Sequence, residues 1–136
     1  MTILVTGGAG FIGSNFILKW CSKNKEKIIN IDNLNYAGNK KNLSNLSPAR
    51  YKFIKGSINN QKLIKSILRK YKIKKIIHFA AETHVDRSIK DASKFIKTNI
   101  NGTFNLLEET RSYYLTLKGP NRSNLKFLHV STDEVF

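Results

Sequence analysis

The feature that most constrains this chain is a glycine-rich turn between an apolar run and a helical segment. Residues 2–6 are all apolar or β-branched, which predicts a strand, and the letters GGAGFIGSN follow directly. Gly8, Gly10 and Gly13 satisfy the spacing G-x-G-x-x-G, and Gly7 in place of Gly8 satisfies G-x-x-G-x-x-G. Because such a turn lacks Cβ atoms and opens a helix, a pyrophosphate can approach its amides and the positive end of the helix. The sequence therefore predicts a phosphate-binding turn between a strand and a helix.

The second apolar run ends in a carboxylate at a defined distance from this turn. The run covers Lys27 to Asp32, and Asp32 lies 19 positions after Gly13. In dinucleotide-binding folds, a carboxylate about 20 residues beyond the glycines accepts hydrogen bonds from the adenosine ribose. Its charge repels a 2′-phosphate, so the sequence predicts NAD as the cofactor in preference to NADP. A glycine turn that merely joins a strand to a helix is the less favoured alternative in this context.

Short apolar runs alternate with longer helical segments along the whole chain. Runs rich in Ile, Val or Phe predict strands at Thr2–Thr6, Lys27–Asp32, Tyr51–Lys55, Lys75–Ala80 and Lys126–Ser131. Their nearly continuous hydrophobicity is typical of parallel strands that are covered on both faces. Right-handed crossovers place such strands in the order 3-2-1-4-5. We therefore predict an α/β fold, a Rossmann-type doubly wound parallel sheet truncated after strand five, with residues 1–136 as one incomplete NAD-binding domain.

The segments between these runs have helical periodicity or turn composition. Helices are predicted near residues 12–22, 59–72 and 89–116. The segment Asn33–Pro48 is polar and rich in Asn, which predicts a long loop with room for one short helix. The last helix has one apolar stripe at a spacing of mostly three or four residues. The stripe consists of Ile89, Ala92, Ile96, Ile100, Phe104, Leu107 and Tyr114.

The composition bounds the class of protein. The chain has 24 Lys and Arg against 9 Asp and Glu, a formal charge of +15. Most of the basic residues are Lys scattered along the whole length, whereas Arg is the better reader of bases and phosphates, so we predict no specific nucleic-acid binding. No run approaches the ~20 apolar residues that cross a bilayer, and the N-terminus lacks the features of a signal peptide. With Cys21 as the single cysteine, we predict a cytoplasmic protein that does not associate with membranes.

Five stretches of the sequence are similar, in order, to motifs of a known family. The chain resembles the extended short-chain dehydrogenase/reductases and, among them, the dTDP-glucose 4,6-dehydratases. The glycine turn alone would fit any nucleotide-sugar enzyme of this class, whereas the triplet Thr132-Asp133-Glu134 points to the dehydratase branch. The matching stretches are residues 6–15, 32–39, 78–89, 99–103 and 129–135.

The resemblance implies an NAD-dependent lyase that converts dTDP-glucose to dTDP-4-keto-6-deoxyglucose and water. In the family reaction, carbon C4 of the sugar gives a hydride to NAD while its hydroxyl loses a proton and becomes a ketone, and the new ketone acidifies the C5 proton. Loss of the C6 hydroxyl follows, and the hydride returns to C6. By resemblance, Asp133 is the acid that protonates the leaving hydroxyl, Glu134 is the base that removes the C5 proton, and Thr132 hydrogen-bonds the C4 oxygen. Two carboxylates in different environments can divide such work.

The resemblance also implies a set of residues around the cofactor. The turn contributes Gly7, Gly10, Phe11, Ile12 and Gly13, and the end of the second strand contributes Asp32, Asn33, Leu34 and Asn35. The adenine, ribose and nicotinamide are assigned to Ser57, Ile58, Phe79, Ala80, Ala81, Glu82, Thr83 and Thr98, and the substrate to Thr83 and Thr132. Ser57 stands where the family usually has an aspartate. No metal site is expected, because His78, His84 and His129 include no closely spaced ligand pair.

One motif of the family is absent from these 136 residues. Members take their redox base from a Tyr-x-x-x-Lys pair on the helix after strand five. The four pairs with this spacing here begin at Tyr36, Tyr51, Tyr71 and Tyr114, and all precede Thr132. We therefore expect an inactive N-terminal fragment without the C-terminal substrate domain, and homodimers of the full-length members. The alternatives are a UDP-sugar epimerase or decarboxylase of the same superfamily and a non-catalytic NAD-binding remnant.

Overall fold

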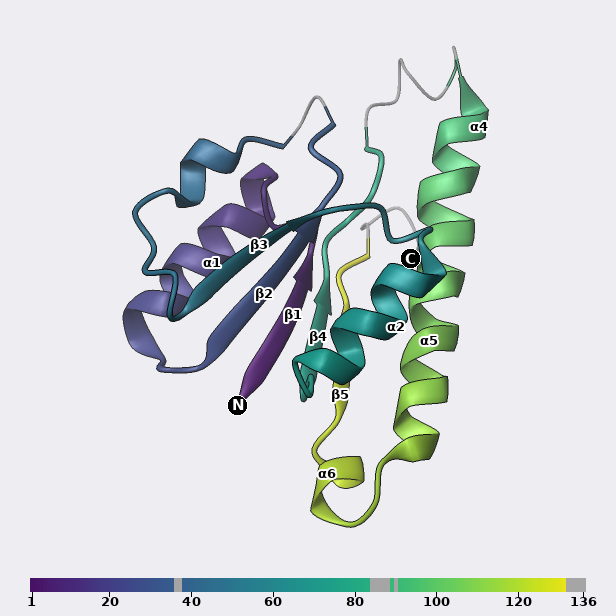
Figure 1. The fold of residues 1–136 in the computed structure, drawn as a ribbon. Helices are drawn as coiled ribbons and strands as arrows, with labels where there is room; N and C mark the ends of the chain where they lie inside the picture. The colour runs from purple at the N-terminus through teal and green to yellow at the C-terminus, as the bar shows by residue number, and fades with distance from the viewer. Residues whose placement is uncertain (36–37, 84–88, 90, 132–136) are drawn as a thin grey trace.

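A five-stranded parallel sheet forms the centre of the computed structural model, which describes residues 1–35, 38–83, 89 and 91–131 (Figure 1). The strands are β1 (Thr2–Thr6), β2 (Lys27–Asp32), β3 (Tyr51–Lys55), β4 (Lys75–His78) and β5 (Lys126–His129). They are hydrogen-bonded in the order β3-β2-β1-β4-β5. This order confirms the predicted doubly wound topology, in which β1 lies at the centre and the chain crosses over it after β3.

Strands β4 and β5 are each two residues shorter than predicted. Their apolar character continues to Ala80 and Ser131, but β4 ends at His78 and β5 at His129. A single ladder bond follows each strand, from Phe79 N–H to Thr6 O at 3.0 Å and from Val130 N–H to His78 O at 3.1 Å. Beyond these bonds the residues line a cavity and no longer pair with a neighbouring strand. Apolar composition alone does not distinguish residues that pair in the sheet from residues that line the cavity.

Helices cover both faces of the sheet (Figure 1). The helices are α1 (Phe11–Lys23), the 3-10 helix η1 (Lys40–Leu43), α2 (Gln61–Lys70) and α5 (Thr103–Thr116). Alternate residues of β1 serve two separate cores, because Ile3 and Val5 pack with α1 whereas Leu4 packs with α2 and α5. Each such fully buried aliphatic side chain contributes about 1.5–3 kcal/mol. Burial on both faces explains the unbroken apolar runs of the strands.

The predicted helix over residues 89–116 consists of three segments with two kinds of winding. It contains α4 (Ala92–Phe95), the π-helical segment η2 (Ile96–Gly102) and α5. Its predicted apolar stripe faces outward, since Ile100 is 61% exposed and Phe104 67% exposed. The core-facing side of α5 instead has Leu106, Thr110 and Tyr113, all buried. The stripe therefore does not mark the side of this helix that packs on the sheet.

Two short helices complete the described chain. The 3-10 helix η1 falls in the polar segment that was predicted to have room for one, and Asn39 caps it by accepting a hydrogen bond from Lys41 N–H at 3.0 Å. Helix α6 (Pro120–Ser123) has proline near its first position, where the missing N–H costs nothing, and was not predicted. In the described part of the chain, no helix combines the length and apolarity needed to span a membrane.

Candidate functional site

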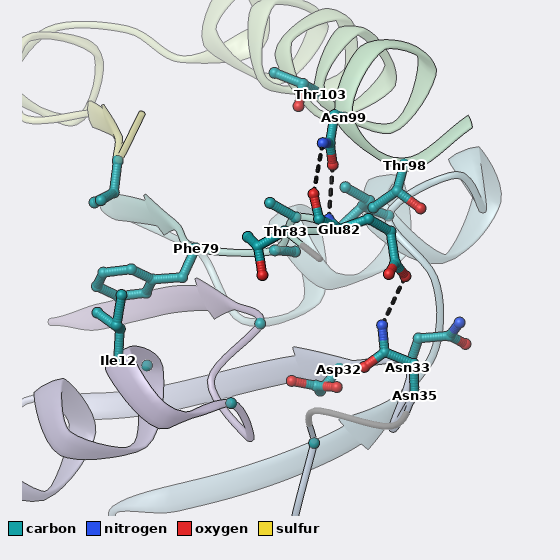
Figure 2. A pocket seen from close by; sticks show the side chains of 18 of the residues that line it. Ile12, Asp32, Asn33, Asn35, Phe79, Glu82, Thr83, Thr98, Asn99 and Thr103 are labelled. Atoms are coloured by element: carbon teal, nitrogen blue, oxygen red, sulfur yellow. Dashed lines mark hydrogen bonds between the residues drawn. The ribbon is translucent and has the colours of Figure 1, made fainter. Parts of the chain in front are cut away.

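A cavity of about 740 Å³ opens where the carboxyl ends of the parallel strands meet (Figure 2). Its volume lies within the range of sites for small ligands and cofactors. All the predicted cofactor-binding residues line it except Leu34. The other lining residues are Ile31, Gly38, Gly56, Phe95, Asn99, Thr103, His129, Val130 and Ser131. The cavity is therefore built from the ends of several strands, which is where doubly wound sheets bind ligands.

The glycine turn brings three backbone segments closer than side chains would allow. Gly7 has φ of 72°, and a Cβ atom there would lie 2.6 Å from Ala80 N. A Cβ atom on Gly13 would lie 2.4 Å from Gly7 O. No side chain caps the N-terminus of α1 at Gly10, and its first turn carries no acidic residue. The first amides of α1 are therefore left for an anion in the cavity, at the positive end of the helix.

The Asp32 carboxylate lies directly beside this turn, as the 19-residue spacing predicts. Its Oδ2 accepts a hydrogen bond from Ala9 N–H at 2.9 Å, and its Oδ1 accepts one from Leu34 N–H at 2.8 Å. Asp32 is 9% exposed and lines the cavity. The two bonds fix the carboxylate, and each oxygen keeps a lone pair that can accept from a ligand hydroxyl.

A buried amide behind the turn was missed by sequence reasoning. Asn30 lies on β2 and is fully buried. Its Oδ1 accepts from Gly8 N–H at 3.0 Å, and its Nδ2 donates to the Tyr51 hydroxyl at 2.9 Å. The signal was present as one amide inside the apolar run of β2, since a buried polar side chain there needs partners. Asn30 thus ties the glycine turn to β3.

A second set of hydrogen bonds joins the segment after β2 to the segment after β4, and that segment to η2 (Figure 2). Asn35 Nδ2 donates to Glu82 Oε1 at 2.7 Å. Glu82 N–H donates to Asn99 Oδ1 at 2.8 Å, and Asn99 Nδ2 donates to Glu82 O at 2.9 Å. Asn99 lies in η2, so this π-helical segment holds the loop after β4 through both the oxygen and the nitrogen of one side-chain amide. These hydrogen bonds hold Asn35, Glu82 and Asn99 in place along the wall of the cavity.

An imidazole is buried beneath the same wall. His78 is 1% exposed and stacks on the His129 ring at a centroid distance of 4.9 Å. Its Nδ1 is 2.6 Å from Thr6 Oγ1, and its Nε2 is 3.0 Å from Thr103 Oγ1. Burial, with a smaller contribution from His129, lowers the pKa of His78 from 6.5 to about 4. His78 is therefore neutral at physiological pH, with one protonated ring nitrogen.

Comparison with known proteins decides the family. A family model described as GDP-mannose 4,6 dehydratase matches residues 4–136. This chain belongs to that family. It is 46% identical over 136 residues to a dTDP-glucose 4,6-dehydratase of Xanthomonas campestris, with 99% of this chain and 38% of the relative covered. These matches confirm the resemblance to the dTDP-glucose 4,6-dehydratases, and the chain spans about 38% of the length of that relative.

Solved structures of family members and related enzymes have the same fold. A dTDP-glucose 4,6-dehydratase of Bacillus anthracis in complex with NAD matches with a TM-score of 0.81 at 39% identity, over 99% of this chain and 38% of that chain. A UDP-glucose 4-epimerase of Thermotoga maritima matches with a TM-score of 0.79 at 33% identity, over 97% of this chain and 38% of that chain. The fold is thus shared between dehydratases and epimerases.

The predicted catalytic residues of this dehydratase-family chain lie outside the described residues. Thr132, Asp133 and Glu134 follow directly after Ser131, which is described and lines the cavity. His84 likewise falls in a segment that the structure does not describe. The roles assigned to the triplet therefore remain predictions. Among the described residues, no group of three His, Cys, Asp or Glu side chains could hold a metal ion.

None of the described tyrosines of the four Tyr-x-x-x-Lys pairs lines the cavity. Tyr51, Tyr71 and Tyr114 are absent from its lining, and Tyr36 is not described. Burial raises the pKa of Tyr51, although the hydrogen bond from Asn30 opposes the shift. A raised pKa is the opposite of what a tyrosine base requires. None of these described tyrosines is therefore placed to act on a ligand in the cavity.

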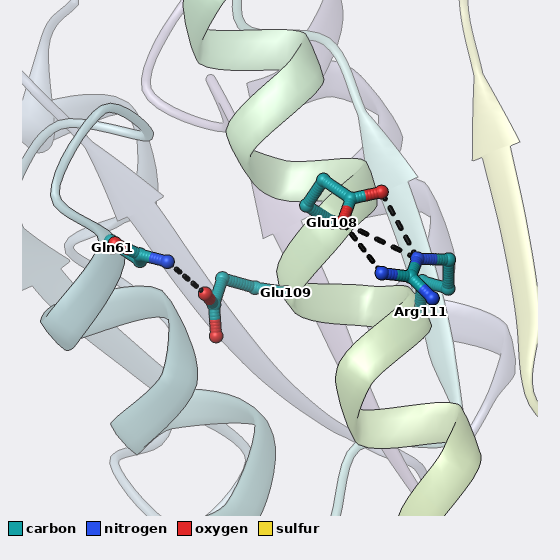
Figure 3. A network of polar contacts seen from close by, with 4 residues as sticks. All are labelled: Gln61, Glu108, Glu109 and Arg111. Atoms are coloured by element: carbon teal, nitrogen blue, oxygen red, sulfur yellow. Dashed lines mark hydrogen bonds and ion pairs between the residues drawn. The ribbon is translucent and has the colours of Figure 1, made fainter.

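A polar cluster elsewhere in the molecule is structural (Figure 3). Gln61 of α2 donates to Glu109 Oε1 of α5 at 2.7 Å, and Glu109 is 5% exposed. On the outer side of α5, Arg111 makes three hydrogen bonds to Glu108, with an ion-pair distance of 2.9 Å. The buried pair joins the two helices, whereas the exposed pair spans one turn of a single helix. Neither pair contributes to the cavity.

Proposed function

We propose that this chain is the NAD-binding part of a dTDP-glucose 4,6-dehydratase, which forms dTDP-4-keto-6-deoxyglucose and water. The observation that carries the proposal is the fixed position of the Asp32 carboxylate beside the glycine turn, 2.9 Å from Ala9 N. This pairing supplies acceptors for the adenosine ribose and amides for the diphosphate. The dehydratase names of the relatives support the reaction class.

The residues present fit a dinucleotide. The close approach at Gly7 and Gly13 leaves no room for a side chain, whereas a Cβ atom on Gly10 would lie 3.4 Å from its nearest neighbour, so the turn is open on the cavity side. Asp32 then holds the adenosine end, the start of α1 faces the diphosphate, and the nicotinamide half extends over β4 and β5. When bound, NAD accepts a hydride from the sugar and later returns it. The carboxylate of Asp32 favours NAD over NADP because it repels a 2′-phosphate.

The acid–base chemistry is assigned to the segment that follows Ser131. In this proposal, Thr132 hydrogen-bonds the C4 oxygen, Asp133 gives a proton to the departing C6 hydroxyl, and Glu134 takes the C5 proton. Thr83, which lines the cavity after β4, contacts the sugar. The proposal is supported by the described residues just before this segment: β5 ends at His129 and Ser131 lines the cavity at the carboxyl edge of the sheet, where catalytic groups of doubly wound folds gather.

Titration calorimetry on the 136-residue chain tests cofactor binding. We expect NAD⁺ to bind and NADP⁺ to bind more weakly. Asp32→Asn removes the charge that accepts the ribose hydroxyls, and hydrogen bonds to charged groups are worth about 1.5–3 kcal/mol, so NAD⁺ affinity falls about 10- to 100-fold. Glu108→Gln makes the same charge change on the outside of α5 and should leave binding unchanged. Equal affinities of NAD⁺ for both variants would refute the assignment of Asp32.

Turnover is a separate question from binding. We expect the 136-residue chain to bind NAD⁺ without converting dTDP-glucose, because none of its described Tyr-x-x-x-Lys tyrosines lines the cavity. The chain is incubated with NAD⁺ and dTDP-glucose, and the 4-keto-6-deoxy product is measured. Accumulation of that product would contradict the expectation.

A UDP-sugar epimerase is the second candidate. The match to the UDP-glucose 4-epimerase of Thermotoga maritima, at 33% identity, favours it. The pair Asp133-Glu134 speaks against it, because an epimerase has no hydroxyl to eliminate. A full-length form of the protein, as long as its relatives, is tested with a panel of dTDP- and UDP-sugars. Loss of water indicates the dehydratase, and inversion at C4 indicates the epimerase.

The cellular setting is part of the same proposal. We infer a cytoplasmic enzyme that acts on a free nucleotide sugar, has no specific nucleic-acid partner, and forms homodimers when full-length. Weak binding of polyanions at low salt is expected from the charge of +15, and it should vanish at physiological salt.

A further inference from the structure

We propose that the Thr103 hydroxyl donates a hydrogen bond to the nicotinamide-riboside half of the bound dinucleotide. His78 is the positioning residue, because it donates to the Thr103 oxygen and so leaves the Thr103 proton available for the ligand. The inference rests on the proposed function. Thr103 is the first residue of α5 and lines the cavity. His78 lies behind it and joins it to Thr6 of β1.

Burial determines where the hydroxyl proton of Thr6 points. Thr6 is fully buried, so its hydroxyl proton needs an acceptor within the protein. Its oxygen accepts from Ala80 N–H at 3.4 Å. Among the described residues, the only acceptor available to its proton is His78 Nδ1, at 2.6 Å. The Thr6 hydroxyl therefore donates to Nδ1, and this ring nitrogen carries no proton.

The Thr6 hydroxyl in turn determines which nitrogen of His78 carries the proton. His78 is neutral at physiological pH, and a neutral imidazole has one protonated nitrogen. Because Nδ1 is the acceptor for Thr6, the proton is on Nε2. Nε2–H therefore donates to Thr103 Oγ1 over 3.0 Å. The opposite tautomer would leave the buried hydroxyl proton of Thr6 without an acceptor, which is unfavourable.

The hydroxyl proton of Thr103 has no acceptor among the described residues. Its oxygen already accepts from His78, so its own proton must be donated elsewhere. Two other threonines of α5 donate to backbone carbonyls, Thr110 to Leu106 O at 2.7 Å and Thr116 to Tyr113 O at 2.7 Å. Within the described residues, Thr103 has no such carbonyl partner. Its hydroxyl is therefore a donor without a protein acceptor at the wall of the cavity.

The position of this donor selects the part of the ligand that it meets. Asp32 lies at the end of β2, on one side of β1, whereas His78 and His129 lie on β4 and β5, on the other side. A dinucleotide with its adenosine at Asp32 and its diphosphate over the start of α1 extends its nicotinamide half toward β4 and β5. The Thr103 donor therefore faces the oxygen acceptors of that half, which are its ribose hydroxyls and its carboxamide.

The decisive experiment compares NAD⁺ with ADP, which lacks the nicotinamide half, in calorimetric titrations of the chain. Thr103→Val keeps the shape and removes the donor, so NAD⁺ affinity should fall roughly 5- to 20-fold while ADP affinity is unchanged. Thr103→Ser keeps the hydroxyl and should restore most of the NAD⁺ affinity. Thr116→Val is the matched control on the same helix, outside the cavity, and should leave both affinities unchanged.

Each outcome is informative. An unchanged ADP affinity also demonstrates that Thr103→Val is folded. Equal NAD⁺ affinities for the wild type and Thr103→Val overturn this inference and leave the proposed function intact. Failure of the wild type to bind either ligand overturns both. An equal loss of NAD⁺ and ADP affinity in Thr103→Val overturns the inference, because it assigns Thr103 a structural role only.

The tautomer is tested without any ligand. The ¹⁵N chemical shifts of an imidazole distinguish its protonated nitrogen from its unprotonated one, and a His129→Gln variant helps to assign the signals. We expect His78 to be protonated at Nε2 at neutral pH. Thr6→Val removes the hydroxyl that fixes this tautomer and should change the ¹⁵N shifts of His78. Protonation of His78 at Nδ1 in the wild type would overturn the inference even if NAD⁺ binds.

Discussion

Replacing Gly13 with alanine tests how closely α1 packs on the glycine turn. The added Cβ atom would lie 2.4 Å from Gly7 O and 2.7 Å from Gly8 Cα, both backbone atoms. Ordinary contact begins near 3.4 Å, so the start of α1 must move by about 1 Å. Overpacking of this kind costs about 1–3 kcal/mol, and the better helix propensity of alanine returns at most about 1 kcal/mol. We expect Gly13→Ala to lower the free energy of unfolding by about 1–2 kcal/mol.

Urea unfolding followed by circular dichroism measures this loss. With an m-value of about 2 kcal/mol/M, the midpoint should fall by about 0.5–1 M. Gly10→Ala is the matched control in the same turn, because φ of Gly10 is −73° and its Cβ atom would lie 3.4 Å from the nearest atom. That variant should lose less than about 1 kcal/mol, the cost of alanine at an N-cap. Equal midpoints for Gly13→Ala and the wild type would refute the packing argument.

Three further predictions concern burial and charge. Because burial lowers the pKa of His78 to about 4 from an unfolded value of 6.5, protonation favours the unfolded chain, and about 3 kcal/mol of stability should be lost as the pH falls from 6.5 to 4. Urea midpoints at several pH values should show a shallower loss in His78→Gln, and an equal slope would contradict the assignment. Ile64→Ala in the core should cost about 2–5 kcal/mol, whereas Ile100→Ala, at a 61% exposed position, should cost less than about 0.5 kcal/mol by the same assay. Arg111→Ala breaks only the exposed pair with Glu108, so its thermal midpoint should match that of the wild type.

The strand pattern is the part of the fold that the sequence predicts best. Strands β1, β2 and β3 have the predicted boundaries because turn residues or polar segments bound each apolar run. The place of Asp32 beside the glycine turn also follows from sequence, since the length of α1 and the pairing of β1 with β2 leave little freedom. Local spacing and parallel topology together account for this half of the cavity.

Two features of the structure depend on contacts between segments that are distant in the sequence, and the sequence does not predict them. The apolar stripe with Ile100 and Phe104 is a helical pattern, but periodicity does not tell which partner covers it. The link from Thr6 through His78 to Thr103 joins residues 72 and 25 positions apart, and single polar letters in apolar runs do not reveal their partners. Residue spacing therefore predicts the side of the cavity at Asp32, and the family resemblance adds residues 79–83 and Thr98 on the side of β4. The hydrogen bonds that join Thr6, His78 and Thr103 are the part that only the tertiary structure reveals.

The π-helical segment η2 sets the angular phase between the two ends of one long helix. In a regular α-helix each residue advances by about 100°, whereas a π turn, with its bonds from i to i+5, takes up one extra residue. Asn99 sits inside that wide turn and reaches Glu82, while Leu106, further along, still points into the core. Deleting Ile100 would return the winding to its usual pitch and swing Asn99 round the axis by about 100° relative to Leu106. The extra residue thus sets the rotation between the two parts of the helix. Because of it, Asn99 faces the cavity while Leu106 faces the core.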